Sequence, residues 1–218
     1  MISNASILHD RVHAAHLLGE RLLAYRNTEA VVLGIPRGGV PVGYHLAEML
    51  KLPFDIILCK KIKHPACASK SIGSVSIDEV SVSEECRDVP QDYVSHQISL
   101  IRHGLQAKQK FYKGNTLPVD IRNKTVILAD DLLANPDTML AAIKSIRKRM
   151  PAAVIVAVPV STPEASLTIA HEADDFIFLL VESQGNPVGH GYESCPIVSE
   201  EEVRNLIQQS SEGVYSSK

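Results

Sequence analysis

Two adjacent aspartates follow a strongly apolar segment in the second half of the sequence. Asp130 and Asp131, called the acid pair below, come directly after residues 125–129, which read Thr-Val-Ile-Leu-Ala. Two carboxylates at the end of a buried strand repel each other, so such a pair is usually kept for binding a ligand. Carboxylate oxygens bind magnesium and accept hydrogen bonds from sugar hydroxyls. We therefore predict a magnesium or sugar-binding role for the acid pair.

A glycine-containing loop with one arginine is the second candidate. This glycine loop, Pro36–Gly39, follows the apolar residues 30–35. Gly38 and Gly39 let the backbone approach a ligand, and Arg37 adds a fixed positive charge, so the loop suits an anion. An ordinary tight turn between a strand and a helix would use the same residues. The segment has neither the spacing of a dinucleotide fingerprint nor the lysine of a Walker loop.

Two consecutive lysines are the third candidate. Lys60 and Lys61 follow an expected strand over residues 55–59. Cations at a strand end suit an anionic ligand, and a solvated basic loop is the alternative interpretation. The segment 60–90 is irregular, with one short strand expected over residues 72–77. An irregular stretch of this length inside a compact domain indicates a functional loop.

Apolar periodicity predicts the elements that position these residues. Compact apolar runs predict buried strands over residues 30–35, 55–59, 125–129, 153–158 and 176–181. Helical spacing predicts helices over residues 1–25, 40–50, 91–112, 136–150, 163–173 and 199–209. Strands that alternate with helices predict an α/β fold with a mostly parallel sheet covered on both faces. Ligands of such sheets lie at the carboxyl ends of the strands, where the three candidates are expected.

The composition fits one domain over residues 1–218, with a disordered tail from about residue 210. Hydrophobic residues make up 45% of the chain and charged residues 22%, which is typical of a soluble globular protein. The net charge of −3 argues against a general nucleic-acid binder. The absence of tryptophan and the aromatic content of 5% argue against a single-strand stacking platform.

Cysteine usage and hydropathy predict a cytoplasmic protein. The four cysteines are scattered and include no C-x-x-C pair, so they offer no framework for disulfides or a metal. The first residues lack the apolar core of a signal peptide. The longest apolar run, residues 152–160, is too short to span a membrane, so no membrane partner is expected.

Taken together, these segments resemble type I phosphoribosyltransferases, and most closely a group of predicted members without an assigned reaction. The resemblance covers roughly residues 30–205 and is carried by residues 31–42, 60–61, 72–73, 130–131 and 198–203. It implies a mostly parallel sheet with helices on both faces and a small hood, formed by the N-terminal helix and the segment after Val181. It also implies a small-molecule phosphoribosyl donor, a loop that closes over the site, and a possible homodimer.

The resemblance assigns a role to each candidate. It implies that Arg37, Gly38 and Gly39 bind the pyrophosphate of phosphoribosyl pyrophosphate, with Lys60 and Lys61 supporting its charge. It implies that Asp130 and Asp131 are catalytic and bind the ribose hydroxyls, directly or through magnesium. The next segment, residues 132–138, is called the phosphate loop below, and it would hold the 5-phosphate through Ala134, Asn135 and Thr138.

The phosphate loop departs from the family pattern. Relatives read Asp-Asp-Gly-x-x-Thr-Gly-x-Thr, whereas residues 130–138 read Asp-Asp-Leu-Leu-Ala-Asn-Pro-Asp-Thr. Pro136 offers no backbone N–H, and Asn135 followed by Pro136 forms a self-contained helix start. Asp137 would repel a phosphate about 5 Å away by on the order of a few kcal/mol.

Two functions are therefore compatible with the sequence. One is a phosphoribosyltransferase that acts on an unknown nitrogenous acceptor. The other is a non-catalytic regulator or ligand sensor that keeps the fold. A metal-dependent hydrolase is a third class, but the nine histidines include no H-E-x-x-H pattern.

Overall fold

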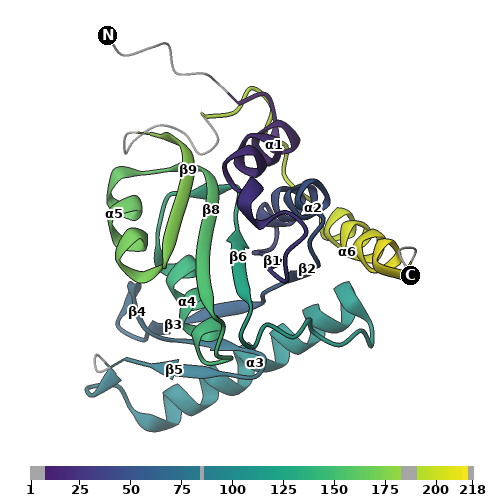
Figure 1. The fold of residues 1–218 in the computed structure, drawn as a ribbon. Coiled ribbons are helices and arrows are strands. Elements are labelled where there is room, and N and C mark those ends of the chain that lie inside the picture. The colour runs from purple at the N-terminus through teal and green to yellow at the C-terminus, as the bar shows by residue number, and fades with distance from the viewer. Residues whose placement is uncertain (1–7, 84–85, 183–190, 216–218) are drawn as a thin grey trace.

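The computed structural model describes residues 8–83, 86–182 and 191–215, and its centre is a six-stranded parallel sheet. Its strands are β1 (Val31–Gly34), β2 (Phe54–Ile56), β6 (Thr125–Ala129), β7 (Leu132–Leu133), β8 (Ala153–Ser161) and β9 (Asp175–Val181). They lie in the order β2-β1-β6-β8-β9, and β7 pairs with β8 beyond the end of β6. The predicted mostly parallel sheet is thereby confirmed (Figure 1).

Helices cover both faces of the sheet, as predicted. One face carries α1 (Arg11–Arg21), the 3-10 turn η1 (Leu23–Tyr25), α2 (Gly39–Leu50) and α6 (Glu200–Tyr215). The other face carries α4 (Asp137–Arg147) and α5 (Pro163–Glu172). The long helix α3 (Gln91–Lys113) packs against α6 and lies along one end of the molecule (Figure 1).

The strand residues alternate between the two cores, because successive side chains of a strand point to opposite faces. Val32, Ile127 and Ile155 are buried under α1, α2 and α6. Val31, Val126 and Val154 are buried under α4 and α5. Since both faces are buried, the strands read as continuous apolar runs, which is the pattern that identified them.

Residues 59–82 form a second, antiparallel sheet where the sequence predicted an irregular loop. Its strands are β3 (Cys59–His64), β4 (Cys67–Ser76) and β5 (Val80–Val82). Ile62, Ile72 and Val75 are fully buried, and the sheet packs against α3 and α4. The short strand predicted over residues 72–77 is confirmed as part of β4, whereas β3 and β5 were missed because their few apolar residues stand among Lys and Ser. Lys60 and Lys61 consequently lie within β3 and not in a loop at a strand end.

Side-chain caps begin two of the helices, and the last helix is longer than expected. Thr162 Oγ1 accepts from the N–H of Ala165 (3.3 Å), and Ser199 Oγ from that of Glu202 (3.0 Å). Helix α6 reaches Tyr215, so the tail predicted to be disordered from about residue 210 is helical through Tyr215. The hydroxyls of Ser210 and Ser211 donate to Ile207 O, so these polar side chains have hydrogen-bond partners within the helix.

The described part of the hood consists of residues 8–21 and 191–199. Backbone hydrogen bonds join its two segments, from Leu8 N to Gly191 O (2.8 Å) and from Glu193 N to Leu8 O (2.8 Å). Leu8 and Tyr192 pack with Val160 at the end of β8. The hood therefore sits over the carboxyl ends of the strands. Residues 183–190, which belong to the same predicted segment, lie outside the described part.

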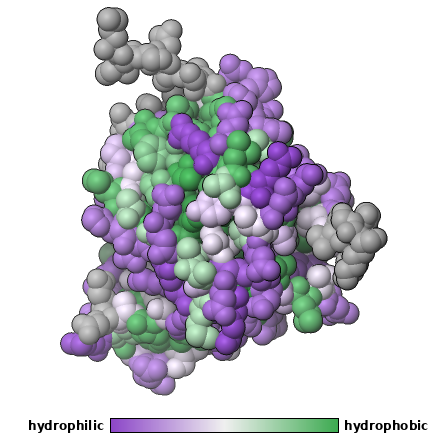
Figure 2. Space-filling view, viewed as in Figure 1, coloured by the Kyte–Doolittle hydropathy of each residue, from purple (hydrophilic) through white to green (hydrophobic). Residues whose placement is uncertain are grey.

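Strand β9 forms one edge of the sheet, and its apolar side chains are only half buried. Figure 2 shows apolar side chains gathered over β8 and β9. The side chain of Arg21 donates a hydrogen bond to the backbone carbonyl of Phe178 in this strand. Within the three described ranges, no helix is long and apolar enough to cross a membrane.

Candidate active site

The glycine loop and the acid pair lie against each other because β1 and β6 are neighbours. Gly34 pairs with Ala129 at the ends of these strands, and Ile35 N donates to Ala129 O (2.9 Å). The chain then turns through the glycine loop, in which the Pro36–Arg37 peptide bond is cis, and enters α2. Two segments almost a hundred residues apart in the sequence therefore meet at one point.

The contact is so close that only glycine fits on the α2 side. A Cβ atom on Gly38 would lie 2.1 Å from Asp131 Oδ2. A Cβ atom on Gly39 would lie 2.5 Å from Ala129 O and 2.8 Å from Asp130 Cα. Gly39 is thus required by the approach of the backbone, whereas the neighbour of Gly38 is the side-chain carboxylate of Asp131.

Arg11 is a site residue that the sequence analysis missed. Its Nε and Nη2 atoms lie 2.8 Å and 2.7 Å from Asp131 Oδ2. The two side chains are 12% and 17% exposed. Arg11 Nη1 also donates to Pro196 O (2.7 Å), and the Tyr192 hydroxyl donates to Asp131 O (2.9 Å). The hood is therefore fastened to the acid pair through Asp131.

Burial and the neighbouring carboxylate control the ionisation of this site. Burial first, and then the charge of Asp131, raise the pKa of Asp130 well above its ordinary value. Burial raises the pKa of the Cys59 thiol to about 12, and burial also raises the pKa of Cys195. Both shifts disfavour the thiolate form, so burial does not mark either cysteine as an activated nucleophile.

The phosphate loop is occupied by internal contacts. Leu132 and Leu133 pair as β7 with the end of β8. Asn135 Oδ1 accepts from the N–H of Asp137 (2.8 Å), but the N-cap of α4 is Pro136, one residue later than predicted. The Thr162 hydroxyl donates to Ala134 O (3.4 Å). The first N–H of α4 is thus already used by the protein.

Lys61 contacts the phosphate loop and not the glycine loop. Its ammonium group bonds to Asp137 Oδ2, so it neutralises the charge that was expected to repel a phosphate. Lys60 is exposed on β3. That Lys60 and Lys61 support the charge of a pyrophosphate stays a prediction.

Arg37 is exposed at the tip of the glycine loop and faces the start of α6. A hydrogen bond from the Tyr112 hydroxyl lowers the pKa of Glu200, and the charge of Arg37 lowers it further. Lys108 Nζ lies 3.1 Å from Glu200 Oε1. The segment around Glu200, which carried part of the family resemblance, therefore anchors α6 to α3 close to the glycine loop.

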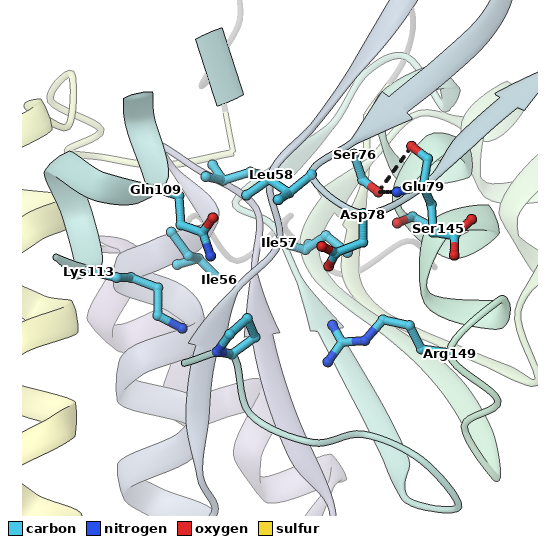
Figure 3. A pocket seen from close by; sticks show the side chains of 12 residues that line it. Ile56, Ile57, Leu58, Ser76, Asp78, Glu79, Gln109, Lys113, Ser145 and Arg149 are labelled. Atoms are coloured by element: carbon cyan, nitrogen blue, oxygen red, sulfur yellow. Dashed lines mark hydrogen bonds between the residues drawn. The ribbon is translucent and has the colours of Figure 1, made fainter. Parts of the chain in front are cut away.

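Two cavities lie beside α4, one along its first turns and one at its opposite end, away from the phosphate loop. One, of about 300 Å³, separates the small sheet from α4 and is lined by Lys61, Asp137, Lys144 and several serines. Figure 3 shows the other, where Gln109 and Lys113 lie on one side and Arg149 on the other. Its volume is about 50 Å³, room for roughly one or two waters, which is too small for a sugar phosphate.

Comparison with known proteins identifies the family. A family model described as "Phosphoribosyl transferase domain" matches residues 4–194. The chain belongs to this family. Two curated proteins of Mycobacterium tuberculosis, from strains CDC 1551 / Oshkosh and H37Rv, are each 27% identical over 213 residues and carry the name "Putative phosphoribosyl transferase". The match covers 94% of this chain and 47% of each relative, so the chain spans about half their length.

The fold of this phosphoribosyl transferase domain is also found in a solved structure. The crystal structure of TT1426 from Thermus thermophilus is 29% identical, with a TM-score of 0.86. The superposition covers 93% of this chain and 98% of that chain. The sheet, the helices and the hood therefore belong to a fold shared with this protein along nearly its whole length.

The acid pair fits magnesium only in part. Magnesium is commonly held by one or two carboxylates together with substrate phosphates. Among the described residues, no group of three or more His, Cys, Asp or Glu side chains could hold a metal. Asp130 Oδ1 accepts from Asp131 N (2.9 Å), and Asp131 Oδ2 accepts from Arg11. A metal at this phosphoribosyl transferase site would need further oxygen atoms, from water or from a bound ligand, to complete its coordination.

Proposed function

We propose that the domain binds phosphoribosyl pyrophosphate with magnesium and transfers the phosphoribosyl group to a nitrogenous acceptor. The observation that carries this proposal is the contact between the glycine loop and the acid pair. A loop that offers backbone N–H groups and Arg37 suits a pyrophosphate, and carboxylates beside it suit the ribose hydroxyls. Because Gly38 and Gly39 lie against the acid pair, one donor molecule can reach both groups.

The proposed reaction is a displacement at the anomeric carbon. The lone pair of the acceptor nitrogen forms a bond to C1 while the C1–O bond to pyrophosphate breaks. The bonding electrons leave with the pyrophosphate, and the nitrogen loses a proton. Arg37 and the amino end of α2 would stabilise the charge that develops on the leaving group. The acid pair would hold the ribose in place, and bound magnesium would neutralise part of the pyrophosphate charge.

Donor binding is expected to require both magnesium and the acid pair. At 100 times the dissociation constant, phosphoribosyl pyrophosphate should stabilise the protein by about 2.7 kcal/mol. Asp130→Asn should weaken binding at least about tenfold, because the amide carries no charge for a metal. Titration calorimetry and thermal unfolding, with and without magnesium, would measure this effect, with ribose 5-phosphate and pyrophosphate as controls. Absence of binding at millimolar donor would refute the proposal.

The contacts within the phosphate loop favour a second candidate, a non-catalytic ligand sensor. Asn135 already takes the N–H of Asp137, Pro136 has none, and Leu132 is part of β7. These groups would not be available to a 5-phosphate. A sensor with this site would bind a ligand that lacks the 5-phosphate and would release no pyrophosphate.

Restoring the family pattern of the phosphate loop separates the two candidates. If the altered loop prevents binding of a 5-phosphate, the variant Leu132→Gly/Pro136→Gly/Asp137→Ala should gain about tenfold or more in affinity for ribose 5-phosphate. The reason is that backbone hydrogen-bond donors are restored and a negative charge is removed. Asp92→Ala, which removes an exposed acidic residue from the first turn of α3, is the matched control. Calorimetry would measure both variants. An unchanged affinity in the restored variant would mean that the loop is not the cause.

A further inference from the structure

The guanidinium group of Arg11 contacts the acid pair in the way that a bound cation would. Two of its nitrogen atoms converge on the single oxygen Asp131 Oδ2, at 2.8 Å and 2.7 Å. The guanidinium group is largely buried within the hood, where it also donates to Pro196 O and contacts the Cys195 side chain. Burial acts to lower the pKa of Arg11, but the charge of Asp131 and the hydrogen bond to it together raise this pKa above its ordinary value.

A metal ion and Arg11 would compete for the same carboxylate. An oxygen that accepts two guanidinium N–H groups has both of its lone pairs engaged. A divalent ion could still reach the other oxygen, Asp131 Oδ1, but it would meet a carboxylate whose negative charge Arg11 already neutralises. The two cations would also repel each other at short distance, where the surroundings screen little. Simultaneous binding of both to Asp131 is therefore unfavourable.

We propose that Arg11 is a built-in counter-ion of the acid pair and that a divalent metal enters only when Arg11 leaves Asp131. That the protein uses a metal rests on the proposed function. The competition between Arg11 and a metal ion for Asp131 is a property of the protein alone. Release of Arg11 is feasible because Pro196 O stays available as an acceptor. If the released state makes up about a tenth of the molecules or less, the apparent metal affinity falls at least tenfold.

The test is manganese binding to the full chain, followed by electron paramagnetic resonance without donor. Arg11→Gln should bind Mn²⁺ about tenfold or more tightly than the unchanged protein. Arg26→Gln, which removes an exposed arginine a short distance along the chain, controls for net charge and should bind as the unchanged protein does. Adding Asp131→Asn to Arg11→Gln should abolish the gain, because the released carboxylate is then missing.

A second control separates the effect of removing the Arg11 charge from the effect of loosening the hood. Tyr192→Phe removes the other side-chain contact between the hood and Asp131 but keeps Arg11, so Mn²⁺ affinity should not rise. An equal gain in Tyr192→Phe, or no gain in Arg11→Gln, would overturn the proposal. If Arg11→Gln does not fold, Arg11→Lys keeps the charge but loses the two-nitrogen contact and should show a smaller gain. Unchanged affinity in Arg11→Lys would then overturn it.

The same variants distinguish this inference from the proposed function. Calorimetry with magnesium and phosphoribosyl pyrophosphate forms the second arm. Tighter Mn²⁺ binding in Arg11→Gln, with no donor binding in any variant, would uphold the counter-ion and refute the donor site. Donor binding combined with equal Mn²⁺ affinity in all variants would support the donor site and refute the counter-ion role of Arg11.

Discussion

Replacing Lys113 with methionine is expected to lower the free energy of unfolding by about 3–5 kcal/mol, because it leaves a buried carboxylate without its partner. Lys113 Nζ lies 2.6 Å from both carboxylate oxygens of Asp55, and each side chain is only 5% exposed. Asp55 also accepts from the N–H groups of Ile56 and Val119. The pair ties the end of α3 to β2, at the edge of the sheet.

Urea unfolding would measure this loss, with two variants as controls. Lys110→Met removes an exposed lysine from the same helix and should change stability by less than about 0.5 kcal/mol. Asp55→Asn/Lys113→Met removes both charges but keeps an acceptor for Val119, so it should recover at least half of the loss. A loss in Lys113→Met no larger than that in Lys110→Met would show that the ion pair does not hold α3 in place.

Replacing Gly39 with alanine is expected to damage both the fold and the site. The added Cβ would meet Ala129 O and Asp130 Cα, which are backbone atoms at the end of a central strand and cannot turn aside. Overpacking of this kind costs about 1–3 kcal/mol. The strain falls on the acid pair, so the proposed binding of the donor, which depends on that pair, should weaken.

Gly104 offers the matched control for Gly39. A Cβ on Gly104, within α3, would have nothing within 4 Å, so Gly104→Ala should stabilise the protein by about 0.5–1 kcal/mol. Gly38→Ala should be milder for stability than Gly39→Ala, since the clash is with a side-chain carboxylate. Thermal unfolding and donor calorimetry would compare the three. Equal behaviour of Gly39→Ala and Gly104→Ala would contradict the close contact described above.

The sequence predicted those parts of the fold that depend on local pattern. Strands buried on both faces appear as apolar runs, so β1, β6, β8 and β9 were found within a few residues. The acid pair and the glycine loop stand directly after such strands, and strand order brings them together. Their positions could therefore be predicted before any contact between them was known.

The remaining features depend on contacts between distant segments. Arg11 and Asp131 are 120 residues apart, and nothing in the surroundings of Arg11 marks it as more than a residue on an amphipathic helix. The pairing of Lys61 with Asp137 depends on how the small sheet packs against α4. Two strands of the small sheet, β3 and β5, were missed because the sheet is stabilised by a few scattered apolar side chains and not by a continuous apolar run.

The origin of the hood from two distant segments has a consequence for the order of folding. Arg11 and Pro196 are 185 residues apart, so this contact closes one of the longest loops in the chain. Loop closure over such a distance carries a high entropic cost and tends to come late in folding. During synthesis, β1, β6 and α2 can assemble before residues 191–196 leave the ribosome. The surroundings of Asp131 are therefore completed last, after the scaffold that carries it has formed.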